Sequence, residues 1–94
     1  MLSFEWDDAK AAANEAKHGV SFQAAVRAFS DPHGIDVIDE TMDYGEIRFS
    51  LVAFSSEVLL SVAYTERGEK VRIISARRAT RRERVNYDSE NPKI

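Results

Sequence analysis

The chain has 94 residues, of which 44% are hydrophobic and 31% charged, and it contains no cysteine. This length allows one domain with one hydrophobic core, and the composition is that of an ordinary globular protein. The lack of cysteine excludes disulfides, thiolate metal sites and cysteine nucleophiles. The sequence shows no secretory signal and no apolar run long enough to cross a membrane, so we expect a single cytoplasmic domain over residues 1–94.

Charge is distributed unevenly along the chain. Residues 1–66 hold four Lys/Arg and twelve Asp/Glu, a net charge of −8, whereas residues 67–94 hold nine and four, a net charge of +5, which together give the overall −3. Residues 70–84 alone carry seven basic residues against one acid. Clustered arginines repel one another unless anions share the site. Either the acidic part of the chain folds back onto this segment, or the segment faces a polyanion such as RNA.

The first third of the sequence predicts a strand and two helices. Residues 3–6 form a short apolar run, and Asp7 and Gly19 are typical residues for the two ends of a helix between them. Ser21 suits the cap of a second helix over residues 22–29. In the first helix, helical spacing predicts one polar face that carries Lys10, Asn14, Lys17 and His18. The same spacing predicts that four alanines pack closely against the protein: Ala9, Ala12, Ala13 and Ala16.

The rest of the sequence predicts four strands of an antiparallel meander and a last helix. The strands are expected at residues 35–39, 47–54, 58–66 and 71–76, with the first half-buried or at an edge and the third in the centre. Thr80 and Glu83 form a capping box that opens a helix through Tyr87, and residues 88–94 should be a frayed tail. The order β-α-α-β-β-β-β-α indicates an α+β protein with a mainly antiparallel sheet packed by helices.

Two long motifs in this order resemble the BrnT family of type II toxins. F-x-W-D-x-x-K-x-x-x-N-x-x-K-H-G-V-S-F spans residues 4–22, and R-I-I-S-A-R-x-A-x-x-x-E-R-x-x-Y spans residues 72–87. The resemblance implies a RelE-like fold and a ribonuclease that arrests translation. It also implies neutralisation by a ribbon-helix-helix BrnA antitoxin, in a complex that represses its own operon. Asp8 stands where the family pattern leads us to expect proline, which concerns entry into the helix rather than chemistry.

Cleavage of RNA without a metal needs a base for the 2′-hydroxyl, cations that stabilise the phosphorane, and an acid for the leaving 5′-oxygen. Arginine keeps its proton, so the arginines are candidates for charge stabilisation, and histidine is the residue type that changes charge near neutrality. The catalytic candidates are His18, Arg48, Arg72, Arg77 and Glu83.

Each catalytic candidate has a structural alternative. His18 could cap the last carbonyls of its helix, and Arg48 could pair with an acid of the 35–39 strand. Arg72 could likewise make a cross-strand ion pair, although the phosphate role is favoured for it. Glu83 could act only in the capping box or hold a neighbouring arginine. Arg77 and Arg78 should point to opposite faces of their strand, because side chains alternate there.

The candidates for RNA binding are basic residues and a tyrosine that could stack on a base: Lys10, Lys17, Arg78, Arg81, Arg82 and Tyr87. For the lysines and the arginines of the last helix, the alternative is a solvated surface. Tyr64 could stack as well, but core packing is the favoured interpretation for Tyr64 and for Trp6.

We expect no metal and no cofactor. His33 is isolated beside a proline, and no histidine pair or acidic cluster has the spacing of metal ligands. Four acids are better interpreted as an acidic edge that disfavours strand pairing or keeps RNA off the wrong face: Asp36, Asp39, Glu40 and Asp43.

The expected partners are RNA and the antitoxin, in a complex of two toxins and two antitoxins that binds DNA through the antitoxin. The alternative to a metal-independent endoribonuclease is a non-catalytic module that docks the antitoxin and strengthens its grip on operator DNA.

Overall fold

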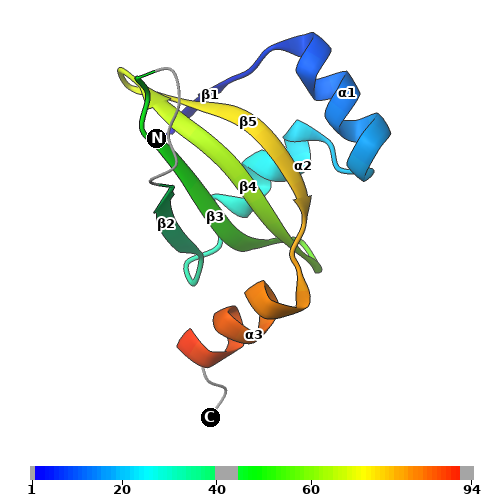
Figure 1. The fold of residues 1–94 in the computed structure, drawn as a ribbon, viewed down its shortest axis with the longest axis vertical. Helices are drawn as coiled ribbons and strands as arrows, with labels where there is room; N and C mark the ends of the chain where they lie inside the picture. Colours follow the sequence, from blue (N-terminus) through cyan, green and yellow to red (C-terminus); the bar gives the residue numbers. More distant parts are fainter. Residues whose placement is uncertain (1, 40–44, 92–94) are drawn as a thin grey trace.

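The computed structural model describes residues 2–39 and 45–91. Its element order confirms the predicted α+β class and the predicted succession of strands and helices (Figure 1). The elements are β1 (Ser3–Glu5), α1 (Asp8–His18), α2 (Phe22–Ala28), β2 (Ile35–Asp39), β3 (Arg48–Ser55), β4 (Val58–Arg67), β5 (Lys70–Arg78) and α3 (Arg81–Glu90).

The strands form one sheet in the order β1-β5-β4-β3-β2. Strands β2 to β5 make the predicted antiparallel meander, with β4 in the centre and β2 at an edge. The short β1 lies parallel beside β5, a pairing that the sequence did not indicate. Gly68 has a φ of 60° in the turn between β4 and β5, a left-handed conformation that glycine adopts without strain.

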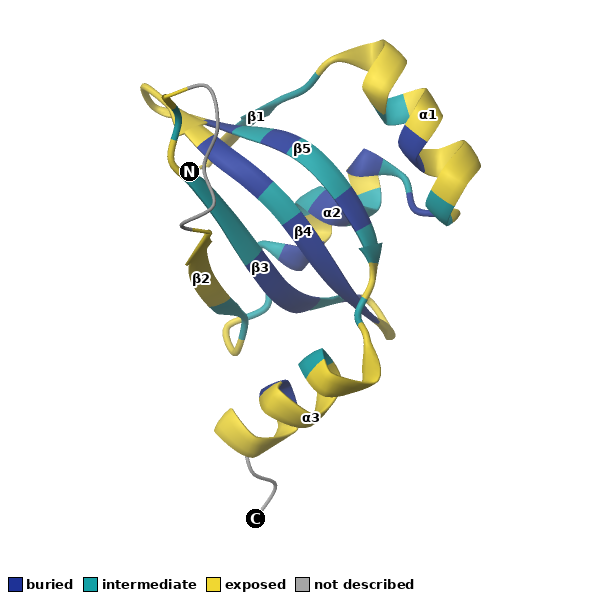
Figure 2. Cartoon of the chain, in the orientation of Figure 1, coloured by how far each residue is buried: buried dark blue, intermediate teal, exposed yellow. Residues whose placement is uncertain are grey.

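The main core lies between α2 and one face of the sheet. Helix α2 starts at the Ser21 cap, as predicted, and contacts β3, β4 and β5. Phe22, Ala25 and Ala28 of α2 are buried in one cluster with Leu60 and Val62 of the central strand. Figure 2 shows the buried parts of α2 and β4 in dark blue. Trp6 packs edge-on against Phe22, with ring centroids 5.9 Å apart, which confirms its predicted place in the core.

The packing of α1 differs from the prediction. Its caps are as expected, since Asp7 accepts from the backbone of Lys10 and Gly19 is left-handed. Asn14, however, is buried and its amide bonds to Ala76 of β5, so it does not belong to a solvated polar face. The four alanines predicted to pack closely, at positions 9, 12, 13 and 16, are exposed. The reason is that β5 presents an unpaired backbone edge to α1, and a polar amide satisfies this edge better than methyl groups do.

A second, smaller core holds α3 at the other face of the sheet. Tyr87 is buried with Val52 and Leu59, and its ring meets Phe54 edge-on at 5.3 Å. The Thr80 capping box is present as predicted. The predicted frayed tail is wrong for residues 88–90, which continue α3, because the Tyr87 anchor holds the last turn in place.

The acidic edge is only partly described. Asp36 and Asp39 lie on β2, the edge strand, and Asp36 accepts a hydrogen bond of 2.5 Å from the Tyr64 hydroxyl. Glu40 and Asp43 lie outside the described residues.

Candidate nucleic-acid interface

The sheet face opposite α2, here called the front face, brings together three of the predicted arginines. Arg48 of β3 and Arg72 of β5 both lie opposite Thr65 of β4, so the three form one row across the sheet. Neighbouring strands are about 4.8 Å apart, which places the two arginine Cα atoms about 10 Å from each other. Arg77 lies further along β5, opposite Ser61, on the same face. Figure 1 shows this face towards the viewer, with α2 behind the sheet and α3 below it.

Arg72 is held by an acid from the far end of the sequence. Its Nη1 donates to Oε2 of Glu5 at 2.8 Å, an ion pair made possible by the parallel pairing of β1 with β5. Both side chains are about 70% buried, since their exposed fractions are 28% and 29%. Among the described residues this contact uses one of the five N–H donors of Arg72, so its other donors can bind phosphate oxygens.

Arg77 and Glu83 make a two-pronged ion pair between β5 and α3. The two nitrogens of the guanidinium lie 2.8 Å and 3.1 Å from the two carboxylate oxygens. The hydrogen bonds from Arg77, joined by one from the Thr80 backbone, lower the pKa of Glu83 below its usual value despite partial burial. The same contact raises the pKa of Arg77. Glu83 therefore fills both predicted structural roles, in the capping box and as the holder of an arginine.

Arg48 lies directly opposite Asp39 of β2, the kind of acidic neighbour that the sequence predicted. Its Nε atom is buried. Between Arg48 and Arg77 the front face carries small residues, among them Ser50 and Ser61, whose hydroxyls are 3.4 Å apart. Small side chains leave room for a bound backbone to approach the arginines.

The predicted cations of α1 form a separate group at the edge of the sheet. Lys10, Lys17 and His18 line one shallow groove with Ile74 and Ser75 of β5. None of the front-face arginines lines this groove. Both groups nevertheless meet at β5, because this strand carries Arg72 and Arg77 and also contacts α1.

The remaining candidates lie in different places. Arg78 points to the α2 side of the sheet, which confirms that Arg77 and Arg78 face opposite ways. Arg81 and Arg82 are exposed on α3. Tyr87 is buried against Phe54 and donates to Asp31, so its ring is not presented for stacking.

Tyr64 is a core residue, as the sequence favoured. Its ring stacks on Phe49, with centroids 5.2 Å apart, and only 8% of the residue is exposed. Burial, together with the hydrogen bond to Asp36, raises the pKa of the Tyr64 hydroxyl far above its usual value.

Two residues that position this region were not found by sequence reasoning. Glu5 gave no indication of its role, because its partner is 67 residues away. Asn14 stood in the family motif, but its spacing suggested a solvated face. Within residues 2–39 and 45–91, no three His, Cys, Asp or Glu side chains come together as metal ligands. No helix in the described part of the chain is long and apolar enough to span a membrane.

Comparison with known families gives one assignment. The family model described as "Ribonuclease toxin, BrnT, of type II toxin-antitoxin system" matches residues 6–83. The match includes every catalytic candidate and most of the RNA-binding ones. No curated protein matches the chain.

Proposed function

Because that match covers most of its length, the chain belongs to the BrnT family of ribonuclease toxins of type II toxin–antitoxin systems, and we propose that its front face is the RNA-cleaving site. Membership implies an RNA substrate and an antitoxin partner. The observation that carries the proposal is the convergence of Arg48, Arg72 and Arg77 on one sheet face from two different strands. We also propose that the fold is RelE-like, as the family resemblance implies.

The proposed reaction is a metal-independent transesterification. The ribose 2′-oxygen attacks the adjacent phosphorus, the bond to the 5′-oxygen breaks, and the products are a 2′,3′-cyclic phosphate and a 5′-hydroxyl. The phosphorane carries extra negative charge, which guanidinium groups fixed in a partly buried site stabilise more than they stabilise the starting diester. Arg72 and Arg77 are fixed in this way by Glu5 and Glu83.

We assign proton transfer to His18, which would take the proton of the 2′-hydroxyl and give a proton to the leaving 5′-oxygen. Its groove borders the strand that carries Arg72 and Arg77. Glu83 is a weaker choice, because its contact with Arg77 lowers its pKa and so makes it a poor base. Lys10 and Lys17 lie in the same groove as His18 and are placed to hold neighbouring phosphates. Arg81 and Arg82 extend positive charge beyond the front face, which would steer RNA towards it.

The proposed biological role is that of a toxin controlled by its antitoxin. Cleavage of RNA by the free toxin would arrest translation, and a ribbon-helix-helix antitoxin would neutralise it in a complex of two toxins and two antitoxins. The antitoxin dimer would supply the DNA-binding part of that complex.

A comparison of two arginine variants tests the site. Arg72→Ala should raise the activation free energy of RNA cleavage by on the order of 2–3 kcal/mol, because it removes a fixed positive charge that stabilises the transition state. The rate is measured in the presence of excess EDTA. Arg82→Ala is the matched control on exposed α3, and should mainly lower RNA affinity and its dependence on salt. Equal and small effects of the two variants would rule out a focused phosphate site. Loss of all activity in EDTA, restored by Mg²⁺, would contradict metal independence.

One observation favours a non-catalytic docking module instead. Arg72 and Arg77 already have carboxylate partners, which is also what purely structural arginines would show. Expression of the chain alone separates the two functions: growth arrest with RNA degradation supports the enzyme, and harmless accumulation supports the module.

A further inference from the structure

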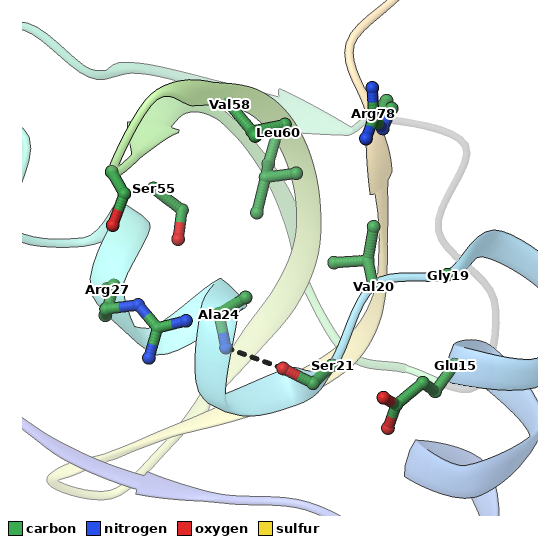
Figure 3. A pocket seen from close by; sticks show the side chains of 11 residues that line it. Glu15, Gly19, Val20, Ser21, Ala24, Arg27, Ser55, Val58, Leu60 and Arg78 are labelled. Carbon is green, nitrogen blue, oxygen red and sulfur yellow. Dashed lines mark hydrogen bonds between the residues drawn. The ribbon is translucent and has the colours of Figure 1, made fainter.

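A pocket on the far side of the sheet is not used by the proposed RNA site. It lies between the end of α1, the helix α2 and the turn from β3 to β4 (Figure 3). Its floor is apolar, because Val20 and Leu60 are buried there and Ala24 and Val58 lie beside them. Val58 is 36% exposed, so part of this apolar surface is open to solvent.

Two arginines stand on opposite sides of this floor. Arg27 comes from the last turn of α2 and Arg78 from the end of β5 (Figure 3). Both are exposed, and within the described ranges neither guanidinium makes a hydrogen bond or an ion pair. By contrast, Arg67, Arg72 and Arg77 each have a carboxylate partner. Two guanidinium groups without an ion-pair partner beside an apolar floor fit a ligand that combines an apolar group with carboxylates.

The lining of the pocket favours a peptide over RNA. Among the described residues no aromatic ring lines it, whereas proteins that hold single-stranded RNA stack its bases on such rings. The carboxylate of Glu15 lies on its rim and disfavours a chain that carries a phosphate at every residue, whereas a peptide can place its carboxylates beside the two arginines alone. An apolar side chain, in contrast, gains free energy on entering this floor.

We propose that this pocket docks a segment of the antitoxin, in which one apolar side chain fills the floor and flanking carboxylates contact Arg27 and Arg78. The proposal rests on the antitoxin partner implied by the family. The pocket lies close to the front face at this point, because Arg78 directly follows Arg77 and their Cα atoms are about 3.8 Å apart. A segment that leaves the pocket past Arg78 needs only to pass the end of β5 to reach the front face.

The test compares charge reversals at two exposed arginines. The dissociation constant for the antitoxin encoded in the same operon is measured by calorimetry with purified chains. Arg27→Glu should raise it by about tenfold or more, since it replaces an attractive rim charge by a repulsive one. Arg67→Glu is the matched control, because Arg67 is an exposed arginine of β4 that pairs with Glu46 and does not line the pocket. It should leave the dissociation constant unchanged. Arg27→Gln removes the charge only and provides a second, milder variant.

RNA cleavage by the free toxin is measured on the same variants. Arg27→Glu should cleave RNA as the unmodified chain does. An unchanged dissociation constant would overturn the proposal, and reduced cleavage with unchanged antitoxin binding would identify the pocket as an RNA subsite instead. Antitoxin binding is measured without reference to cleavage, so a failure of the front-face proposal would appear only in the cleavage assay.

Discussion

Asn14 occupies a position in α1 that faces the sheet, where an apolar residue is usual. Its amide group donates to the carbonyl oxygens of Val20 and Ala76 at 2.9 Å and 2.8 Å, and its oxygen accepts from the Ala76 amide at 3.1 Å. The side chain thus pairs with the backbone of β5 beyond the point where β1 ends. Asn14 therefore binds backbone groups at the edge of the sheet and holds α1, which carries Lys10, Lys17 and His18, against β5.

Replacement of Asn14 by alanine should therefore destabilise the protein. Asn14→Ala leaves buried groups of Val20 and Ala76 without partners, at a cost of about 2–4 kcal/mol. Urea denaturation would measure the change in the free energy of unfolding. Asn86→Ala, on the exposed side of α3, is the matched control and should change it by less than about 0.5 kcal/mol. An equally small change for Asn14→Ala would show that water replaces the amide.

Asp31 joins three parts of the chain that are distant in sequence. Its Oδ2 accepts from the Phe54 amide at 2.8 Å and from the Tyr87 hydroxyl at 2.7 Å, and its Oδ1 accepts from the His33 amide. Burial alone would raise the pKa of Asp31, but these hydrogen bonds outweigh it and lower the pKa below its ordinary value. Burial and, to a lesser extent, the hydrogen bond to Asp31 raise the pKa of Tyr87 to about 12.

The lowered pKa of Asp31 predicts a dependence of stability on pH. A carboxyl whose pKa is lower when folded contributes stability above its unfolded pKa of about 3.9, and this contribution is lost as the pH falls through the folded value. Asp31→Asn should therefore be less stable than the parent at pH 7, and the difference should shrink below about pH 4. Denaturation curves at several pH values measure it. Asp88→Asn, exposed on α3, is the control, and a difference for Asp31→Asn that does not vary with pH would contradict the assignment.

At the scale of elements, α3 is joined to the sheet by few buried groups. Tyr87 is its one buried residue, and α3 packs mainly against β3. The Arg77–Glu83 pair and the Tyr87–Asp31 hydrogen bond tie it to the sheet. Because Glu83 holds Arg77, the position of α3 determines how Arg77 is presented on the front face.

Amide hydrogen exchange should show α3 opening independently of the sheet. Its amides should exchange faster than those of β4 and β5, since local opening exposes little apolar surface. Tyr87→Phe removes the hydroxyl that Asp31 accepts from, and should speed exchange in α3 further while the central strands keep their protection. Tyr64→Phe is the control, since Tyr64 donates to Asp36 outside α3. Equal rates in α3 and β4 would mean that the helix opens only with the whole domain.

At the scale of the whole molecule, the uneven charge of the sequence is partly balanced by folding. Two acids from the first 66 residues, Glu5 and Glu46, fold back onto Arg72 and Arg67. Arg27, Arg78, Arg81 and Arg82 keep exposed charge on the surface. The fold therefore pairs some arginines with acids of the same chain and leaves others exposed, so the acidic part of the sequence folds back onto only part of the basic set.

This division predicts how the toxin–antitoxin complex responds to salt. Apolar burial does not weaken with ionic strength, whereas charge pairs at a rim do. We expect apolar docking with an acidic fringe, so the copurified complex should remain intact at about 1 M NaCl, where the Debye length is about 3 Å. Light scattering after size exclusion should give the mass of two toxins and two antitoxins. Dissociation by moderate salt alone would show that charge dominates the interface.

The sequence by itself determined the features that depend on near neighbours. The caps at Asp7, Ser21 and Thr80, the antiparallel meander and the opposite directions of Arg77 and Arg78 all follow from local spacing and were predicted. The reason is that a cap or a strand alternation involves residues only a few positions apart.

Only the tertiary structure decided which distant residues meet. The row of Arg48 and Arg72 needs the register of three strands, and the contact of Arg72 with Glu5 needs β1 to pair with β5 across 67 residues. The burial of Asn14 likewise follows from the edge of β5 rather than from the pattern of α1. Such long-range pairings depend on how elements pack, and the periodicity of a single segment does not specify which other segment it pairs with.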